Sequence, residues 1–259
     1  MNTAKIKSTL LEALRNAGAI ARAAINAPKD IRLKAVMSLV TQTDMECDRV
    51  IMETIRREFP DHAFLTEESP AQGNSVSRWI VDPIDGTTNF AHGYPAACIS
   101  IAFEHEKQLL MGGVYDPFRD ELFFAERGKG AFLNDKPIHV SKIATLEDAL
   151  LSTGFPYDVR EHADEYLAAF KEFLMITQGM RRPGAAALDL CYVACGRFDG
   201  YYEKSLQAWD KAAGMVIVEE AGGKVTNYKG ERLSVDHRAN LASNGLLHQA
   251  MLNVLGKYA

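Results

Sequence analysis

The sequence predicts a mixed α/β protein built in layers, and three patterns carry this prediction. Apolar residues recur at helical spacing in residues 4–26 and 42–58. Short apolar runs broken by Asp-Pro and Gly turns in residues 97–140 indicate an antiparallel meander of strands. After a break near residue 145, strand and helix patterns alternate. Sheets and helices that share one chain in this way pack as layers around a common core.

In the N-terminal part, residues 26–41 lie between the two helices and are predicted to form a loop or a short hairpin. Two short apolar runs follow, AFLTEE at 63–68 and SRWIVD at 77–82, and each ends in acidic residues. Such runs are typical of buried strands. We therefore expect two core strands whose ends open onto a polar site.

In the C-terminal part, strands alternate with helices and no stretch resembles a flexible linker. We therefore expect one domain over residues 1–259, divided only into subdomains at 1–145 and 146–259. The expected strands lie at 149–155, 198–203, 224–228 and 240–245, and the expected helices at 161–178, 184–196, 208–221 and the closing segment.

Composition indicates an ordinary globular protein, because 47% of the 259 residues are hydrophobic and 24% are charged. The net charge of −5 argues against a general binder of nucleic acid or anionic membranes, which requires a basic surface. Residues 1–25 predict an amphipathic helix, and neither a signal peptide nor a membrane span. The cysteines form no CxxC pair, which favours reduced, buried thiols in a cytoplasmic protein. They are Cys47, Cys98, Cys191 and Cys195.

The segment WIVDPIDGTTNF, residues 79–90, places two aspartates three apart at the end of a predicted strand. The strand brings Asp82 to the sheet end, Pro83 fixes the backbone, and a tight turn is expected to return Asp85 to the same side. No cationic residue nearby in the sequence neutralises the pair, and like charges this close raise each other's pKa. A bound divalent cation explains the arrangement, and Mg²⁺ is the default ion for oxygen ligands.

The residues that follow are suited to a phosphate group. Gly86 lets a ligand approach the backbone closely. Thr87 and Thr88 are suited to capping a helix whose free N–H groups would face a phosphate. The alternative for the whole segment is an ordinary Asx-Pro turn followed by a helix cap.

Other acidic residues strengthen the prediction of a metal site. Of Glu67 and Glu68, which are adjacent at a strand end, only one can point toward the aspartates. Asp210 opens a predicted helix, where the helix dipole favours an acid whether or not it binds metal. Asp44 follows Thr43 at another helix start, and capping is again the simpler interpretation.

Together these segments resemble the inositol monophosphatase family over nearly the whole chain. WIVDPIDGTTNF is similar to the family's first signature, and WDKAAGMVIVEEAGG at 209–223 is similar to its second. The stretches LVTQTD, TEES and RRPGAAALDLCYVACGRFDGYYE stand in the expected order. The resemblance implies an α/β/α/β/α sandwich, usually a homodimer, with Mg²⁺-dependent and Li⁺-sensitive hydrolysis of inositol-1-phosphate and related small phosphate monoesters.

Carried over residue by residue, the resemblance implies two Mg²⁺ sites and a third, weaker one near Glu67. One ion would be held by Glu67, Asp82 and the backbone carbonyl of Ile84. The other would be held by Asp82, Asp85 and Asp210.

The resemblance also implies roles in catalysis and substrate binding. Thr87, paired with Asp44, would orient and deprotonate a metal-activated water that attacks phosphorus in line. The residues implied to bind phosphate are Gly86, Thr87 and Thr88, and those implied to bind the hydroxyls of the alcohol are Gly184, Ala185, Ala186 and Glu203.

The sequence departs from the family pattern at two places. Lys34 stands about where the family often has a lysine, but the usual glycine-rich surroundings are missing, which leaves its role open. Arg181 and Arg182 precede Gly184 and suit a second phosphate, a dimer contact or a solvated loop.

Three alternatives compete with this interpretation. A haloacid-dehalogenase-type phosphatase uses Asp-x-Asp-Gly-Thr and a covalent aspartyl phosphate, but this chain has one residue too many between its aspartates. The same fold also acts on fructose bisphosphate, histidinol phosphate or a phosphoadenosine phosphate. A regulatory or binding protein that merely retains the fold is the third alternative, against which the intact acidic set argues.

Overall fold

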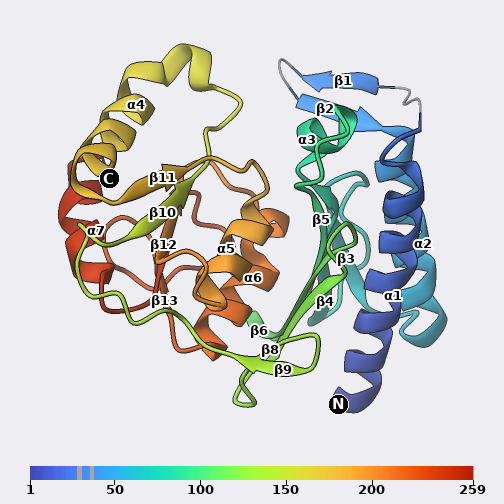
Figure 1. Cartoon of the computed structure of the whole chain (residues 1–259). Helices are drawn as coiled ribbons and strands as arrows, with labels where there is room; N and C mark the ends of the chain where they lie inside the picture. The colour runs from blue at the N-terminus through green and yellow to red at the C-terminus, as the bar shows by residue number, and fades with distance from the viewer. Residues whose placement is uncertain (28–30, 36–37, 259) are drawn as a thin grey trace.

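The computed structural model describes residues 1–27, 31–35 and 38–258, and it places helices and sheets in alternating layers (Figure 1). Two helices cover each outer face, and two more lie between the large sheets. The predicted α/β/α/β/α sandwich is therefore confirmed. From one outer face to the other, the helices are α1 (Thr3–Ala24) and α2 (Gln42–Glu58), then α5 (Ala186–Ala194) and α6 (Ala208–Glu220), then α4 (Val159–Ile176) and α7 (His248–Leu255).

The sheet on the N-terminal side is antiparallel except for one parallel pair, β3 with β4. Its strands, in spatial order, are β3 (Ala63–Thr66), β4 (Ser77–Asp85), β5 (Cys98–His105), β6 (Gln108–Asp116), β7 (Glu121–Glu126), β8 (Ala131–Leu133) and β9 (Lys136–Ile138). The run from β5 to β9 is the meander predicted for residues 97–140.

The second sheet is mixed, since β10 runs parallel to both its neighbours and the other pairs are antiparallel. Its strands, in spatial order, are β11 (Gly179–Arg181), β10 (Leu150–Thr153), β12 (Gly200–Glu203), β14 (Asn240–Ser243) and β13 (Lys224–Thr226). The short strand β11 had no counterpart in the predicted element order. The remaining elements are the hairpin of β1 (Ile31–Ala35) and β2 (Ser38–Thr41), the short helix α3 (Thr87–Ala91) and the 3-10 turn η1 (Gly256–Tyr258).

Buried apolar side chains fill the spaces between the layers in three clusters. The first joins α1 and α2 to the N-terminal sheet, the second joins that sheet to α5 and α6, and the third joins the second sheet to α4 and α7. Representative members are Leu10, Ile51 and Trp79 in the first, Val114, Leu190 and Ala213 in the second, and Leu151, Phe173 and Met251 in the third. None of the helices in the described ranges is long and apolar enough to cross a membrane.

Two consecutive glycines let helices pack closely against both faces of the central strand β6. A Cβ at Gly112 would lie 2.4 Å from the backbone oxygen of Ala213 in α6. A Cβ at Gly113 would lie 2.5 Å from the side chain of Leu10 in α1. Real Cβ atoms do not approach a backbone oxygen that closely, so position 112 excludes larger residues, whereas a larger residue at position 113 would require the Leu10 side chain to shift. The close packing seats α6, and with it Asp210, against the N-terminal sheet.

Candidate active site

Strand β4 delivers both aspartates of the first motif to one place through a bulge. Asp82 pairs with Ser100 of β5, whereas Asp85 pairs with Cys98, so three steps along β4 match two along β5. In a regular strand residues three apart face opposite sides. The extra residue of the bulge changes this alternation, so the side chains of Asp82 and Asp85 face the same side. The expected tight turn after Asp82 is therefore wrong, since the strand continues through Pro83 to Asp85.

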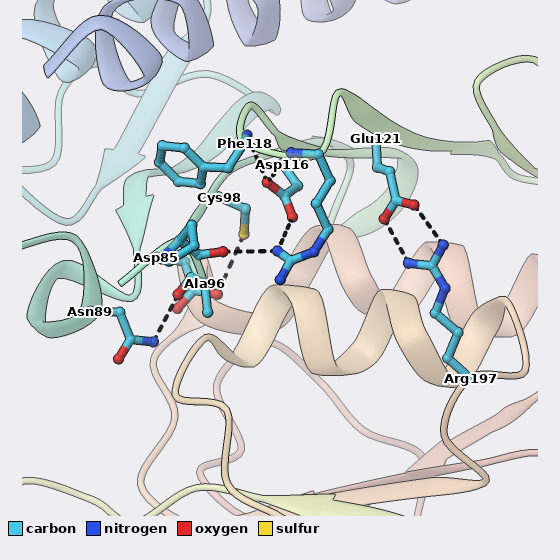
Figure 2. Close-up of polar contacts among 10 residues, drawn as sticks. Asp85, Asn89, Ala96, Cys98, Asp116, Phe118, Glu121 and Arg197 are labelled. Carbon is cyan, nitrogen blue, oxygen red and sulfur yellow. Dashed lines mark hydrogen bonds and ion pairs between the residues drawn. The ribbon is translucent and has the colours of Figure 1, made fainter. Parts of the chain in front are cut away.

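The carboxylate of Asp85 is held by the first turn of α5, far away in the sequence. The backbone N–H of Ala186 donates to Oδ1 at 3.2 Å, and that of Ala187 donates to Oδ2 at 2.7 Å. The Cys98 thiol lies 3.6 Å from Oδ2 and donates from the β5 side (Figure 2). Free N–H groups at a helix start favour an anion. Asp85 therefore joins the N-terminal sheet to the middle helix layer.

Thr87 and Asp44 form a hydrogen-bonded pair across the start of α2. The Thr87 hydroxyl lies 3.0 Å from Asp44 Oδ1 and 2.9 Å from the Ile84 carbonyl oxygen. Asp44 Oδ2 also accepts from the backbone N–H of Thr41 at 2.9 Å, which closes the capping box of α2. Asp44 thus caps its helix with one oxygen and contacts Thr87 with the other.

The expectation that Thr87 or Thr88 caps a helix is wrong. Gly86 is the N-cap of α3, with a φ of 89°, and no side chain makes a capping hydrogen bond there. Because the Thr87 side chain is committed to Asp44 and Ile84, it faces the interior instead. The left-handed backbone at position 86 requires glycine.

Asp82 is enclosed, with 2% of its surface exposed. Its Oδ1 accepts the backbone N–H of Ile84 at 3.1 Å. Burial raises the pKa of Asp82 well above its usual value, and the charges of Glu67 and Asp85 raise it further. The charge of Glu67 therefore acts on Asp82, and its choice over Glu68 as a metal ligand stays a prediction.

Asp210 reaches the cluster from the first turn of α6, where its Oδ2 accepts the N–H of Gln207 at 2.7 Å. Burial and the neighbouring charge of Asp85 raise the pKa of Asp210 to about 8. Burial also raises the pKa of Asp85 to about 7, although the hydrogen bonds from Ala187 and Ala186 oppose the shift. Two aspartates from β4 and one from α6 therefore influence one another's ionisation.

These acids fit a hard divalent cation. Within the described residues, Asp82, Asp85 and Asp210 form no ion pair with a lysine or arginine. Buried carboxylates that repel each other without a counter-charge are costly. Carboxylate and carbonyl oxygens are the donors that Mg²⁺ prefers. Among the described residues, no group of three or more His, Cys, Asp or Glu side chains is arranged around a common point as a metal site. The fit is therefore one of donor chemistry, since the three aspartates and the Ile84 carbonyl offer oxygen atoms.

On the other side of the site, Glu203 ends strand β12 next to the connection that follows β10. The Tyr201 hydroxyl donates to its Oε2. A Cβ at Gly154 would lie 1.9 Å from the same oxygen, so the carboxylate rests on the glycine backbone. Burial raises the pKa of Glu203 to about 7, and Arg182 opposes the shift. The positive charge of Arg182 therefore reaches the candidate substrate side.

The loop before α5 is fastened to the metal motif by one amide. The Asn89 side chain, on α3, donates to the Ala96 carbonyl (Figure 2) and to the Pro183 carbonyl, both at 2.8 Å. This fixes Gly184 and Ala185 beside α3. The resemblance assigned Ala186 to the substrate side, and its backbone N–H is donated to Asp85.

An arginine supports the loop behind Gly86. Arg119 donates to the Pro95 carbonyl at 2.8 Å and pairs with the buried Asp116 at 2.8 Å (Figure 2). A Cβ at Gly86 would lie 2.8 Å from the Ala96 oxygen, so this loop packs directly against the motif. Nothing in the local pattern of Arg119 indicated that role.

Other residues take places that the sequence did not predict. Tyr157, on the connection from β10 to α4, is 56% exposed. Partial burial and the charges of Glu67 and Asp210 raise the pKa of its phenol. Tyr157 therefore borders the cluster.

Lys34 lies in β1, and its side chain is outside the described part of the chain. Arg181 is exposed on β11.

The raised pKa values determine how the stability of the metal-free protein changes with pH. The folded-state pKa values of Asp85 and Asp210 are about 7 and about 8. An unfolded chain holds aspartate near about 4. Between these values the folded state binds more protons, so the free energy of unfolding falls as pH rises from about 4 to about 8. A cation that binds the ionised carboxylates offsets this loss.

We therefore expect excess Mg²⁺ to raise the Tm more at about pH 8 than at about pH 5. Differential scanning fluorimetry measures the shift, with NaCl at matched ionic strength as the control. The Asp210→Asn variant should show a smaller Mg²⁺ shift at the higher pH. Equal Mg²⁺ shifts at both pH values in the unmodified protein would contradict the assignment of these aspartates as ligands.

Comparison with known proteins places the chain in a family. Residues 2–258 match the model of the inositol monophosphatase family. An inositol-1-monophosphatase from Synechocystis is 47% identical over 219 residues, which cover 84% of this chain and 76% of that protein. A putative Nus factor SuhB from Neisseria meningitidis serogroup B is 43% identical, with 87% of each chain covered.

A solved structure gives the same result in three dimensions. The inositol monophosphatase from Anabaena superposes with a TM-score of 0.91 at 42% identity, covering 99% of this chain and 97% of that one. The chain therefore belongs to the inositol monophosphatase family, and it is a phosphatase.

Proposed function

We propose that this chain hydrolyses inositol-1-phosphate and similar small phosphate monoesters, with two or three Mg²⁺ ions per subunit. The observation that carries the proposal is the position of the Thr87 and Asp44 pair. The Thr87 hydroxyl lies within hydrogen-bond distance of both Asp44 and the Ile84 carbonyl, and Ile84 lies between Asp82 and Asp85. A proton-accepting pair therefore stands directly beside a carboxylate cluster suited to Mg²⁺.

The ligands follow from the donor set. Bound Mg²⁺ would lower the pKa of water and neutralise charge on the phosphate and the leaving group. One ion would be held by Glu67, Asp82 and the Ile84 carbonyl, and the other by Asp82, Asp85 and Asp210, with a third near Glu67.

Thr87 and Asp44 would move one proton. Water would give its proton to the Thr87 oxygen while the Thr87 proton passes to Asp44 Oδ1, which already lies within hydrogen-bond distance. The water oxygen would form a bond to phosphorus, the bond from phosphorus to the alcohol oxygen would break, and the alkoxide would take a proton from solvent. The N–H groups of Gly86, Thr87 and Thr88 stand at the first turn of α3, where helical N–H groups lack intrahelical partners. They would orient the phosphate.

Glu203 favours an alcohol that carries several hydroxyl groups. Its carboxylate can accept hydrogen bonds from neighbouring hydroxyls, and it would repel a phosphate. Arg182, which lowers the pKa of Glu203, keeps fructose bisphosphate or a phosphoadenosine phosphate as alternatives, because it offers a cation to a second phosphate. Histidinol phosphate is the third alternative.

Asp82→Asn tests the metal-dependent chemistry with the least disturbance to the fold. Asp82 accepts one backbone N–H, whereas Asp85 accepts two from α5 that an asparagine could not fully replace. We expect kcat to fall by roughly a hundred- to ten-thousandfold, about 3 to 5 kcal/mol in barrier. Steady-state hydrolysis of inositol-1-phosphate provides the measurement, with exposed Asp61→Asn as the control.

Retention of more than about a tenth of the rate, about 1.4 kcal/mol, would argue against Asp82 as a ligand. A phosphoryl group trapped on Asp82 would favour the covalent alternative instead.

The name of the Neisseria relative favours a second, regulatory candidate function. If a strain lacking this protein is rescued equally by Asp82→Asn and by the unmodified chain, the regulatory candidate is supported.

Glu203→Gln tests the choice of alcohol while keeping an acceptor for Tyr201 and the packing on Gly154. We expect KM for inositol-1-phosphate to rise and kcat to stay, because the lost bonds serve ground and transition states alike. Losing one or two charge-assisted hydrogen bonds lowers kcat/KM roughly ten- to a hundredfold, about 1.5 to 3 kcal/mol. p-Nitrophenyl phosphate, which has no hydroxyls, should be unaffected. Equal losses with both substrates would refute the assignment.

We also propose a homodimer. Exposed apolar side chains gather near the end of α4, where Leu174 is 51% exposed and Met175 is 75% exposed. A second copy of this chain would cover them. Light scattering after size exclusion should give a dimer mass, and Met175→Glu should shift it toward a monomer. Leu246→Glu changes a residue that is 59% exposed elsewhere and should leave the mass unchanged. A monomer mass for the unmodified chain would disprove the dimer.

A further inference from the structure

One lysine of the second signature is buried where a charge is costly. Lys211 follows Asp210 in α6 and has 0% of its surface exposed. An ammonium group without matched acceptors costs several kcal/mol to bury. Neither the candidate chemistry nor the substrate side uses this side chain. A buried cation beside a candidate metal ligand therefore requires its own explanation.

The contacts of Lys211 show what its charge does. Its Nζ donates to the Leu206 carbonyl at 3.4 Å and to the His237 carbonyl. The N–H of Leu206 in turn donates to the Arg238 carbonyl at 3.1 Å. Two connections, the one from β12 to α6 and the one from β13 to β14, are thus tied together around a single ammonium group.

A single peptide group connects Lys211 to Asp210. The carbonyl of the Leu206–Gln207 peptide accepts from Lys211 Nζ, and the N–H of the same peptide donates to Asp210 Oδ2 at 2.7 Å. Consecutive residues of α6 therefore hold opposite ends of one peptide plane. A cation on the carbonyl polarises the amide and strengthens the hydrogen bond that its N–H donates. The Lys211 ammonium is placed to act in this way on the bond between Gln207 and Asp210.

We propose that Lys211 is a positioning residue that holds the Asp210 carboxylate in the orientation that receives a divalent cation. The peptide occupies Oδ2, and no donor in the described part of the chain bonds Oδ1. Oδ1 is therefore available to a metal. This inference rests on the proposed function, because it assigns Asp210 as a ligand.

The proposal makes the opposite prediction from simple charge repulsion. A lysine close to the cluster repels Mg²⁺, so removing its charge would tighten metal binding if repulsion alone mattered. If Lys211 orients Asp210, removing it should weaken binding instead. The sign of the change in affinity therefore separates the two roles.

Lys211→Met keeps an unbranched side chain that is one atom shorter and removes its donors. Isothermal titration calorimetry of the full chain with Mn²⁺ and with Mg²⁺ should show one ion bound at least about fivefold more weakly, with the other unchanged. Met215→Ala provides a matched control, since Met215 is 5% exposed on the same helix. It should lower the Tm and leave both affinities unchanged. A general loss of stability would not weaken the binding of one ion in Lys211→Met while leaving both affinities unchanged in Met215→Ala.

A double-mutant cycle tests the route through Asp210. In an Asp210→Asn background, Lys211→Met should cause little further loss of affinity, because the group it positions is already removed. Lys211→Gln retains a hydrogen-bond donor, so its affinity for the divalent cation should lie between that of Lys211→Met and that of the unmodified chain. If Lys211→Met does not fold, the affinity of Lys211→Gln is the test.

The outcomes are distinct. Unchanged or tighter binding in Lys211→Met, or fully additive losses in the double variant, would overturn the positioning role. If the unmodified chain binds no divalent cation, the proposed function fails first. If it binds two ions and both substitutions at Lys211 leave them unchanged, only the inference fails.

Discussion

The structure depends on one carboxylate, that of Asp85, at the start of α5. Two backbone N–H groups of α5 donate to it, and Cys98 donates from the neighbouring strand. The interaction joins residues about a hundred positions apart in the sequence and fixes the N-terminal sheet against the middle helices. It also orients α5, whose preceding loop is fastened to α3 by Asn89. The candidate metal side and the candidate substrate side therefore share one support.

The acids of the cluster serve local structure and candidate chemistry with different oxygens. Asp44 completes a capping box through Oδ2 and contacts Thr87 through Oδ1. Asp210 accepts a backbone N–H through Oδ2 at the start of α6. A helix start is where an acid is stabilised by free N–H groups. One carboxylate can therefore cap a helix with one oxygen and bind a metal with the other.

The sequence predicted the layers and the acidic set because both leave short-range patterns. Helical spacing marked α1 and α2, and two acids at strand ends marked the cluster. The bulge between Asp82 and Asp85 left no such pattern, since its register depends on β5. Tyr157 and Asn89 were also missed, because their positions depend on contacts between distant segments. Lys211 lay inside a recognised signature, yet its burial and the shared Leu206–Gln207 peptide appear only in three dimensions.

The most direct test of the metal-dependent assignment is a crystal structure of the full chain with Mn²⁺ and phosphate, using anomalous scattering to locate the ions. We expect separate peaks between Asp82 and Glu67 and between Asp85 and Asp210, with phosphate against the N–H groups that follow Gly86. The Lys211 ammonium should remain on the Leu206 carbonyl. Absence of any anomalous peak at these carboxylates, or a phosphoryl group bonded to Asp82, would contradict the two-metal hydrolysis proposed for this chain.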